Sequence, residues 1–300
     1  MSEEKETAVE EIKQPRKPAN YYSDKKVKKE YQRFKSLNRV LHFLMILCFF
    51  TLAFTGLTLK FSYTGWAVIL SHLMGGFETA GYIHRFAAVI MVGVFITHII
   101  DVVKMRKKEY GSWKELLFGP DSMLLNKRDL RDFTGSLKWF IGLGERPEYG
   151  RWTYWEKFDY FAVFWGIFVI GSTGLTLWFP QLFTQFLPGW VINIATIIHS
   201  DEALLATGFI FTVHFFNVLL RPEKFPMDFV IFNGEISKED FVTERGAQWD
   251  RYEQQGVTEK YRVHKTSSVV YDLVFKTFGY LCVLTGLFIA FLLLYAFLRS

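Results

Sequence analysis

Five stretches of 20 or more residues almost lack charged side chains, and they constrain the fold more than any other feature of the chain. At about 1.5 Å per helical residue, each can cross a hydrocarbon layer of about 30 Å. Backbone polar groups inside lipid must be satisfied within their own segment, so each stretch predicts a helix. The sequence therefore predicts an all-α polytopic membrane protein, a four-helix bundle with a fifth transmembrane helix. The predicted spans cover residues 38–61, 77–103, 157–179, 191–220 and 269–298.

The basic residues predict how these spans are oriented. Of 35 lysines and arginines, 31 fall within residues 1–39, 104–157 and 221–267, whereas the connections 62–76 and 180–190 contain none. The positive-inside rule assigns segments rich in Lys and Arg to the cytoplasm. We therefore expect a cytoplasmic N-terminus and a C-terminus on the outer side. The formal charge of +5 then reflects topology and contact with anionic lipid, and it does not indicate nucleic-acid binding.

The predicted organisation follows from these spans. We expect a cytoplasmic polar tail (1–35), a four-helix core (36–222) that includes a cytoplasmic loop (104–157), a cytoplasmic segment (223–267) and a C-terminal transmembrane helix (268–300). Both cysteines lie in apolar stretches, and neither CxxC nor CxxCH occurs, which argues against a disulfide framework and against c-type haem attachment. P-loop, GxGxxG, HExxH and GxSxG motifs are also missing from suitable contexts, so we expect no independent substrate chemistry.

Four histidines form two regularly spaced pairs inside the predicted spans. His84 and His98 are 14 residues apart in the second span, and His199 and His214 are 15 apart in the fourth. At 100° per residue the members of each pair lie within about 40° and 60° of one direction, separated axially by about 21 and 22.5 Å. Both spans run from outside to inside, so the pairs match in depth. Ionisable side chains within a membrane are costly and usually functional.

This arrangement suits two planar cofactors, each held between the second and fourth spans. Haem iron takes axial imidazoles from opposite faces of the ring, and two such ligands leave no position for a substrate. Tetrahedral zinc would need its ligands gathered within a few ångströms. We therefore predict a di-haem bundle with two haem b groups, an outer one on His84 and His199 and an inner one on His98 and His214. Together they would form a one-electron path across the bilayer.

A fifth intramembrane histidine, His42, lies about four residues inside the first predicted span. Three roles stay open for it: an inner ligand in place of His98, a partner for a quinone, or a packed polar residue. The angular spacing favours His98 as the ligand. Arg85 and Arg39 are candidates to pair with haem propionates, with contact to lipid headgroups as the alternative.

A repeated motif links the first and third spans. FTGLTLKF at residues 54–61 and STGLTLWFP at residues 172–180 each end a span, and each precedes a short uncharged connection and a span with two histidines. This pattern indicates a duplicated pair of helices. Gly56 and Gly174 in the two copies, together with Gly166 and Gly171, fit either plain packing of small residues or clearance for the faces of haem.

Longer motifs resemble the di-haem membrane cytochrome b subunits of respiratory oxidoreductases, such as formate dehydrogenase gamma subunits and the b-type cytochromes of nickel–iron hydrogenases. The similar segments are NRVLHFL (38–44), TGLTLKF (55–61), IHRFAAV (83–89), YWEKFDYFAVFWG (154–166), IIHSDEALLATGFIF (197–211) and HFFNVLLRPEKFPMD (214–228). The formate dehydrogenase pattern implies His42, His84, His199 and His214 as ligands. The pattern of cytochrome b in quinol–cytochrome c oxidoreductases, with His98 in place of His42, matches equally.

The resemblance implies an electron-transfer subunit in the bacterial inner membrane that exchanges electrons with menaquinone or ubiquinone. It also implies a partner redox subunit, such as a multihaem cytochrome c or an iron–sulfur subunit. From polarity at the cytoplasmic side, we expect the quinone near His42, Asn217 and Arg221. The alternatives are a haem-free membrane anchor and a transporter subunit. The transporter is disfavoured because the spans lack midplane carboxylates and basic pairs.

Overall fold

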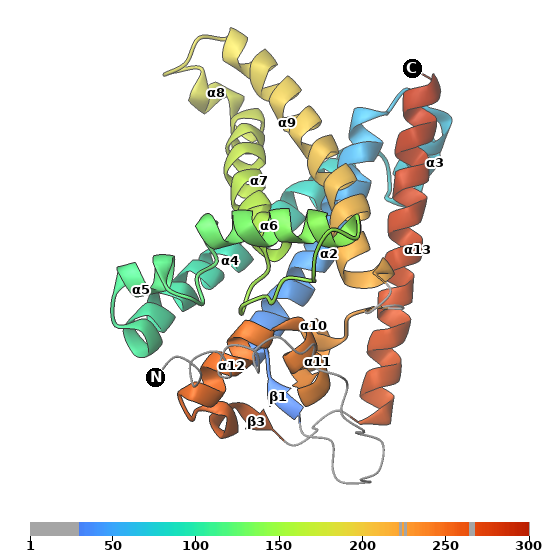
Figure 1. Ribbon diagram of the computed structural model, residues 1–300. Helices are drawn as coiled ribbons and strands as arrows, with labels where there is room; N and C mark the ends of the chain where they lie inside the picture. Colours follow the sequence, from blue (N-terminus) through green and yellow to red (C-terminus); the bar gives the residue numbers. More distant parts are fainter. Residues whose placement is uncertain (1–29, 222–223, 225–226, 264–267, 300) are drawn as a thin grey trace, which may run out of the picture.

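The computed structural model describes residues 30–221, 224, 227–263 and 268–299. Within these residues, five helices are long and apolar enough to cross a membrane, which confirms the predicted all-α polytopic fold (Figure 1). Two of them continue as π-helix, α4 into η2 and α9 into η3 and η4. Their bounds are α2 Ser36–Lys60, α4 Phe77–Met105, η2 Arg106–Tyr110, α7 Tyr154–Trp178, α9 Trp190–Phe209, η3 Ile210–His214, η4 Phe216–Leu220 and α13 Val269–Arg299.

The first four spans pair as two helical hairpins. α2 packs mainly against α4, and α7 packs mainly against α9. The short helix α3 (Gly65–Leu73) lies in the first connection and α8 (Pro180–Phe183) in the second. Each hairpin therefore begins with a helix that carries the TGLTL motif and continues into a helix that carries two histidines, as the repeated motif predicts.

The TGLTL threonines satisfy their hydroxyl groups within their own helices. Thr55 donates to the carbonyl of Thr51 at 2.6 Å, and Thr58 donates to that of Phe54 at 2.7 Å. Thr173 and Thr176 bond four residues back in the same way in α7. These bonds allow polar side chains inside an apolar span without leaving a donor unpaired.

The fifth span, α13, covers the π-helical part of the fourth. Gly286 of α13 faces the rings of Phe211 and Phe215, where a Cβ atom would collide with both. Ile289, one turn further on, is fully buried in the apolar core shared by α2, η3 and α13. The fifth helix is thus packed onto the bundle rather than set apart from it.

The end of the bundle where α2 and α7 begin, called here the basic end, carries a small folded unit. Its centre is β1 (Glu30–Gln32), which pairs antiparallel with both β2 (Glu235–Ser237) and β3 (Arg262–Val263). Tyr31 of β1 packs edge-on against Trp249 and Phe241. The helices of this unit are α10 Val230–Asn233, α11 Lys238–Glu244, α12 Gly246–Gln254 and the 3-10 helix η5 Thr258–Tyr261.

An ion-pair cluster fastens this unit to α7. Arg245 donates two hydrogen bonds to the Glu156 carboxylate, at 2.8 and 2.7 Å, and Arg33 lies 3.5 Å from the same carboxylate. Burial lowers the pKa of Arg33 to about 9, and the nearby Arg245 charge adds to the effect while Glu156 opposes it. Two guanidinium groups thus depend on one carboxylate, so Glu156 joins two segments more than 200 residues apart in sequence, 30–35 and 245–254.

Candidate functional site

The structure brings His84 of α4 and His199 of α9 together between the two hairpins. Their ring centroids are 6.1 Å apart, and the ring planes meet at 71°. Both side chains are partly buried. The two residues were predicted to share one depth, and they are neighbours in the folded chain.

The same kind of contact orients both rings. Nδ1 of His199 lies 2.9 Å from the Ile170 carbonyl, which can only accept, so Nδ1 carries the proton. Nδ1 of His84 lies 2.9 Å from Oγ1 of Thr55. Because the Thr55 hydroxyl already donates to Thr51, its oxygen accepts from His84. In both residues the lone pair therefore resides on Nε2, the nitrogen left to bind a metal.

Glycines of the repeated motif let these rings lie against the preceding helix. A Cβ atom at Gly174 would come within 2.8 Å of Cε1 of His199, and one at Gly56 within 3.3 Å of Cε1 of His84. The clearance at these two positions accommodates the imidazoles. At Gly171, by contrast, a Cβ atom would meet nothing within 4 Å.

This geometry fits an iron porphyrin held by two imidazoles. With metal–nitrogen bonds of about 2 Å on opposite sides of one metal, two imidazole centroids lie about 6 Å apart. The observed 6.1 Å agrees with that separation. Among the described residues no group of three or more His, Cys, Asp or Glu could hold a metal ion, and the candidate centre consists of two imidazoles.

His214 makes a different contact, to a carboxylate. It ends η3, and its Nδ1 lies 2.9 Å from Oδ2 of Asp159 in α7. Both side chains are largely buried. As in the outer pair, the donated Nδ1 proton leaves the lone pair on Nε2. The turns before His214 are π-helix, which rotates less per residue than an α-helix. The directions of His199 and His214 around the helix axis therefore differ by less than the angle of about 60° predicted for a uniform α-helix.

The structure directs His98 toward α7 rather than toward His214. Nε2 of His98 lies 2.8 Å from the hydroxyl of Tyr160, and the imidazole packs edge-on against Tyr160 and Phe164. The predicted pair of His98 and His214 requires α4 to face α9 along its whole length. In the folded chain α4 packs mainly on α2, and the His98 side chain contacts α7.

His42 of α2 lies within electrostatic range of His214. Nδ1 of His42 is buried and has no hydrogen-bond partner within the described part of the chain. A buried, unpaired imidazole nitrogen is costly unless a ligand engages that nitrogen.

The other predicted residues lie around these histidines. Arg39 donates to the Phe232 carbonyl at 2.6 Å and to the Tyr271 hydroxyl at 2.7 Å, which ties α2 to α10 and α13. Arg85 is exposed, with its guanidinium 5.8 Å from the Trp178 ring centre. Arg221, after η4, lies 5.2 Å from the Trp155 ring centre. Asn217 lies in η4, three residues after His214.

Asp159, Tyr160 and the two motif threonines were not predicted from the sequence to take part in the site. Asp159 could have been singled out, because a carboxylate within an apolar span is rare and functional by default. The contacts of Thr55 and Thr173 with histidines depend on how each helix is rotated relative to its neighbour. Residue spacing within one helix does not predict that rotation. Thr173 lies 3.4 Å from Nδ1 of His199 and completes the parallel between the hairpins.

One known protein is similar to the chain over most of its length. The cytochrome b556 subunit of formate dehydrogenase from Haemophilus influenzae is 25% identical over 184 residues, which make up 61% of this chain and 68% of that protein. No protein-family model matches. The similarity confirms the predicted resemblance to membrane cytochrome b subunits and supports a role in membrane electron transfer.

Proposed function

We propose that the chain is the membrane subunit of a respiratory oxidoreductase and passes electrons through two haem b groups between a quinone and a partner redox subunit. The observation that carries the proposal is the His84–His199 pair, with centroids 6.1 Å apart. Bound there, haem would supply one-electron exchange without an open coordination position. The chain's own residues hold the two imidazoles and fix their protons on Nδ1.

For the inner haem we propose His42 and His214 as ligands. Two observations support this choice: His42 lies within electrostatic range of His214, and its Nδ1, unlike Nε2 of His98, is held by no hydrogen bond among the described residues. It corresponds to the formate dehydrogenase pattern. His98, which the spacing favoured, has its Nε2 engaged by Tyr160 and is the alternative.

Asp159 would orient His214 by accepting a hydrogen bond from its Nδ1–H. A carboxylate in this position raises the basicity of the opposite nitrogen more than a neutral acceptor does. The outer histidines bond to neutral acceptors, a carbonyl and a hydroxyl. The two centres would therefore differ in their hydrogen-bond partners, with the more basic ligand at the inner one.

We place the quinone, menaquinone or ubiquinone, at the basic end near His42, Asn217 and Arg221. Arg221 and Asn217 follow His214 closely, so a quinone there would lie beside the inner haem. We also propose that the basic end faces the cytoplasm of a bacterial inner membrane and that the C-terminus is periplasmic, since 31 of 35 basic residues lie on one side of the spans. The partner would be a multihaem cytochrome c or an iron–sulfur subunit.

A reduced-minus-oxidised absorption spectrum of the purified chain, with haem counted per polypeptide, tests this function. We expect a b-type signal, about two haems per chain, and reduction by a quinol analogue. A chain that is folded but lacks haem after expression in haem-replete cells would instead be an anchor or a transporter subunit.

A further inference from the structure

Helix α6 (Lys127–Phe140) has the reverse of the usual distribution of side chains. Its buried residues are all polar, namely Asp129, Asp132 and Ser136. Its most exposed apolar residues are large, from 43% to 71% exposed, namely Leu130, Phe133, Leu137 and Phe140. Contiguous apolar side chains on a surface indicate contact with a protein or with a membrane.

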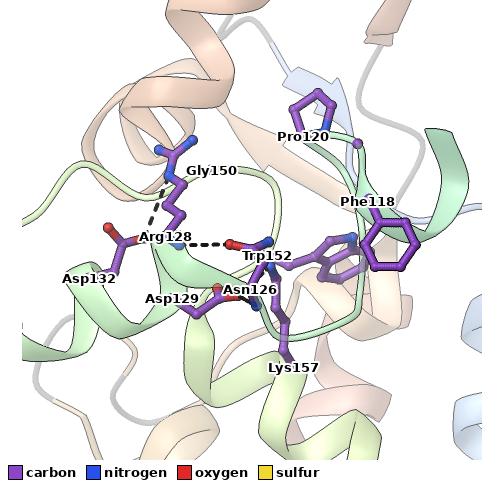
Figure 2. Close-up of a pocket in the computed structure, with 10 residues that line it drawn as sticks. Phe118, Pro120, Asn126, Arg128, Asp129, Asp132, Gly150, Trp152 and Lys157 are labelled. Atoms are coloured by element: carbon purple, nitrogen blue, oxygen red, sulfur yellow. Dashed lines mark hydrogen bonds and ion pairs between the residues drawn. The ribbon is translucent and has the colours of Figure 1, made fainter. Parts of the chain in front are cut away.

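The polar side of α6 is locked onto the first turns of α7. Lys157 of α7 forms a 2.9 Å ion pair with Asp129, and both side chains are only 6% exposed. Ser136 shares a hydrogen bond with Tyr149 at 2.8 Å. Asp129 and Lys157 also line a polar cavity of about 210 Å³. Figure 2 shows their side chains pointing toward one another. Turning the apolar side inward would break this buried pair, so the apolar side has to face outward.

This attachment fixes where the apolar side lies. Lys157 is the fourth residue of α7, at the point where that span begins. α6 runs crosswise to α7 (Figure 1), at one end of the span rather than along it. Large exposed apolar side chains also occur in the chain before and after α6; they are Trp113, Phe118, Leu124, Leu125, Ile141 and Leu143.

A third side of α6 is basic. At 100° per residue, Lys127, Arg131 and Lys138 fall within about 40° of one another, and all three are exposed. The four apolar residues fall within about 80° on a neighbouring side. An apolar stripe flanked by Lys and Arg is typical of helices that lie in the plane of a bilayer surface. Anionic headgroups would complement the basic side.

We propose that α6 lies in the membrane interface, with Leu130, Phe133, Leu137 and Phe140 among the lipid acyl chains and its basic side at anionic headgroups. The attachment of α6 at the start of α7 makes this surface continuous with the lipid-facing surface of the span. The charge of its third side selects lipid over a second protein chain. The segment 104–157 is then a membrane-bound shelf at the base of the α7–α9 hairpin. This inference does not depend on haem.

Depth-dependent fluorescence quenching in the full chain tests the placement. The background is the chain with Cys48→Ala and Cys282→Ala, reconstituted in nanodiscs of phosphatidylcholine and phosphatidylglycerol. Single variants Leu130→Cys and Leu137→Cys carry a bimane label, and nitroxide groups on the acyl chains act as the quencher. Phe168→Cys, exposed within α7, is the lipid-facing control, and Lys138→Cys, on the basic side placed at the headgroups, is the shallow control.

We expect both leucine positions to be quenched nearly as strongly as Phe168→Cys and several-fold more than Lys138→Cys. Two independent positions keep the result interpretable if one variant misfolds, which gel filtration detects. Quenching at both positions no stronger than at Lys138→Cys overturns the proposal in favour of a water-facing surface. Quenching that emerges only after a bound subunit is stripped from the native complex also overturns it, because that subunit and not lipid covers the face.

Discussion

Replacing Gly174 with alanine provides a graded test of how the repeated motif supports the outer site. The new methyl group would lie 2.8 Å from Cε1 and 3.2 Å from Nδ1 of His199. Carbon atoms in contact prefer about 3.5–4.0 Å, so the ring must retreat by about 0.7 Å or more. That movement strains the 2.9 Å hydrogen bond from Nδ1 to the Ile170 carbonyl and displaces Nε2 from its position in the pair with His84.

Overpacking of this kind costs about 1–3 kcal/mol. If the cost falls on haem binding, the outer site loses about 5- to 150-fold in affinity. Gly56→Ala should be milder, because its methyl would lie 3.3 Å from Cε1 of His84 and a shift of a few tenths of an ångström relieves the contact. Gly171→Ala is the matched control on α7, with nothing within 4 Å of the added atom.

Haem per chain and the difference spectrum should be measured for all three variants after expression with limiting haem. We expect outer-haem content to fall in the order Gly171→Ala, Gly56→Ala, Gly174→Ala, with the inner haem kept throughout. Equal haem content and identical spectra for Gly174→Ala and Gly171→Ala would refute the argument that the motif glycine makes room for the imidazole.

Three further predictions concern the inner centre and the basic end. Asp159→Asn replaces a charged acceptor by a neutral one, so the inner haem should titrate at a more positive potential with the outer one unchanged; an unshifted redox titration would count against the carboxylate's role. His42→Ala should lose the inner haem while His98→Ala keeps both, and the opposite result by haem counting would restore His98 as the ligand. Arg245→Leu and Glu156→Gln should each destabilise the unit at the basic end by about 2–3 kcal/mol. Limited proteolysis should detect that loss. Glu156→Gln should be the more sensitive variant because it leaves two guanidinium groups without their carboxylate. Wild-type resistance to protease in both variants would contradict the role of this ion-pair cluster.

The sequence predicted the spans well because a membrane imposes a length and a polarity that one segment must satisfy alone. The helical bounds differ from the predicted ones by a few residues at most ends. The closeness of His84 and His199 was also predictable, since matching depth in two co-directional helices is a property of spacing. The repeated motif predicted the two hairpins, because each copy lies in the helix that precedes a helix with two histidines.

Other parts depend on contacts that spacing does not encode. His98 shares a face with His84 only approximately, and the pairing of α4 with α2 leaves it against Tyr160 of α7. The π turns before His214 change its direction without any mark in the sequence pattern. The sheet at the basic end joins residues 30–32 to 235–237 and 262–263, so its pairing is non-local and none of the three segments predicts it alone.

The central claim is that the imidazoles of α4 and α9 hold a haem between the hairpins, and single His84→Ala and His199→Ala variants test it most directly. Haem should be counted per folded chain in each variant and in the parent. The account predicts about two haems in the parent and one in each variant, with the same spectral component missing from both. A variant that retains both haems, or variants that lose different components, would contradict it.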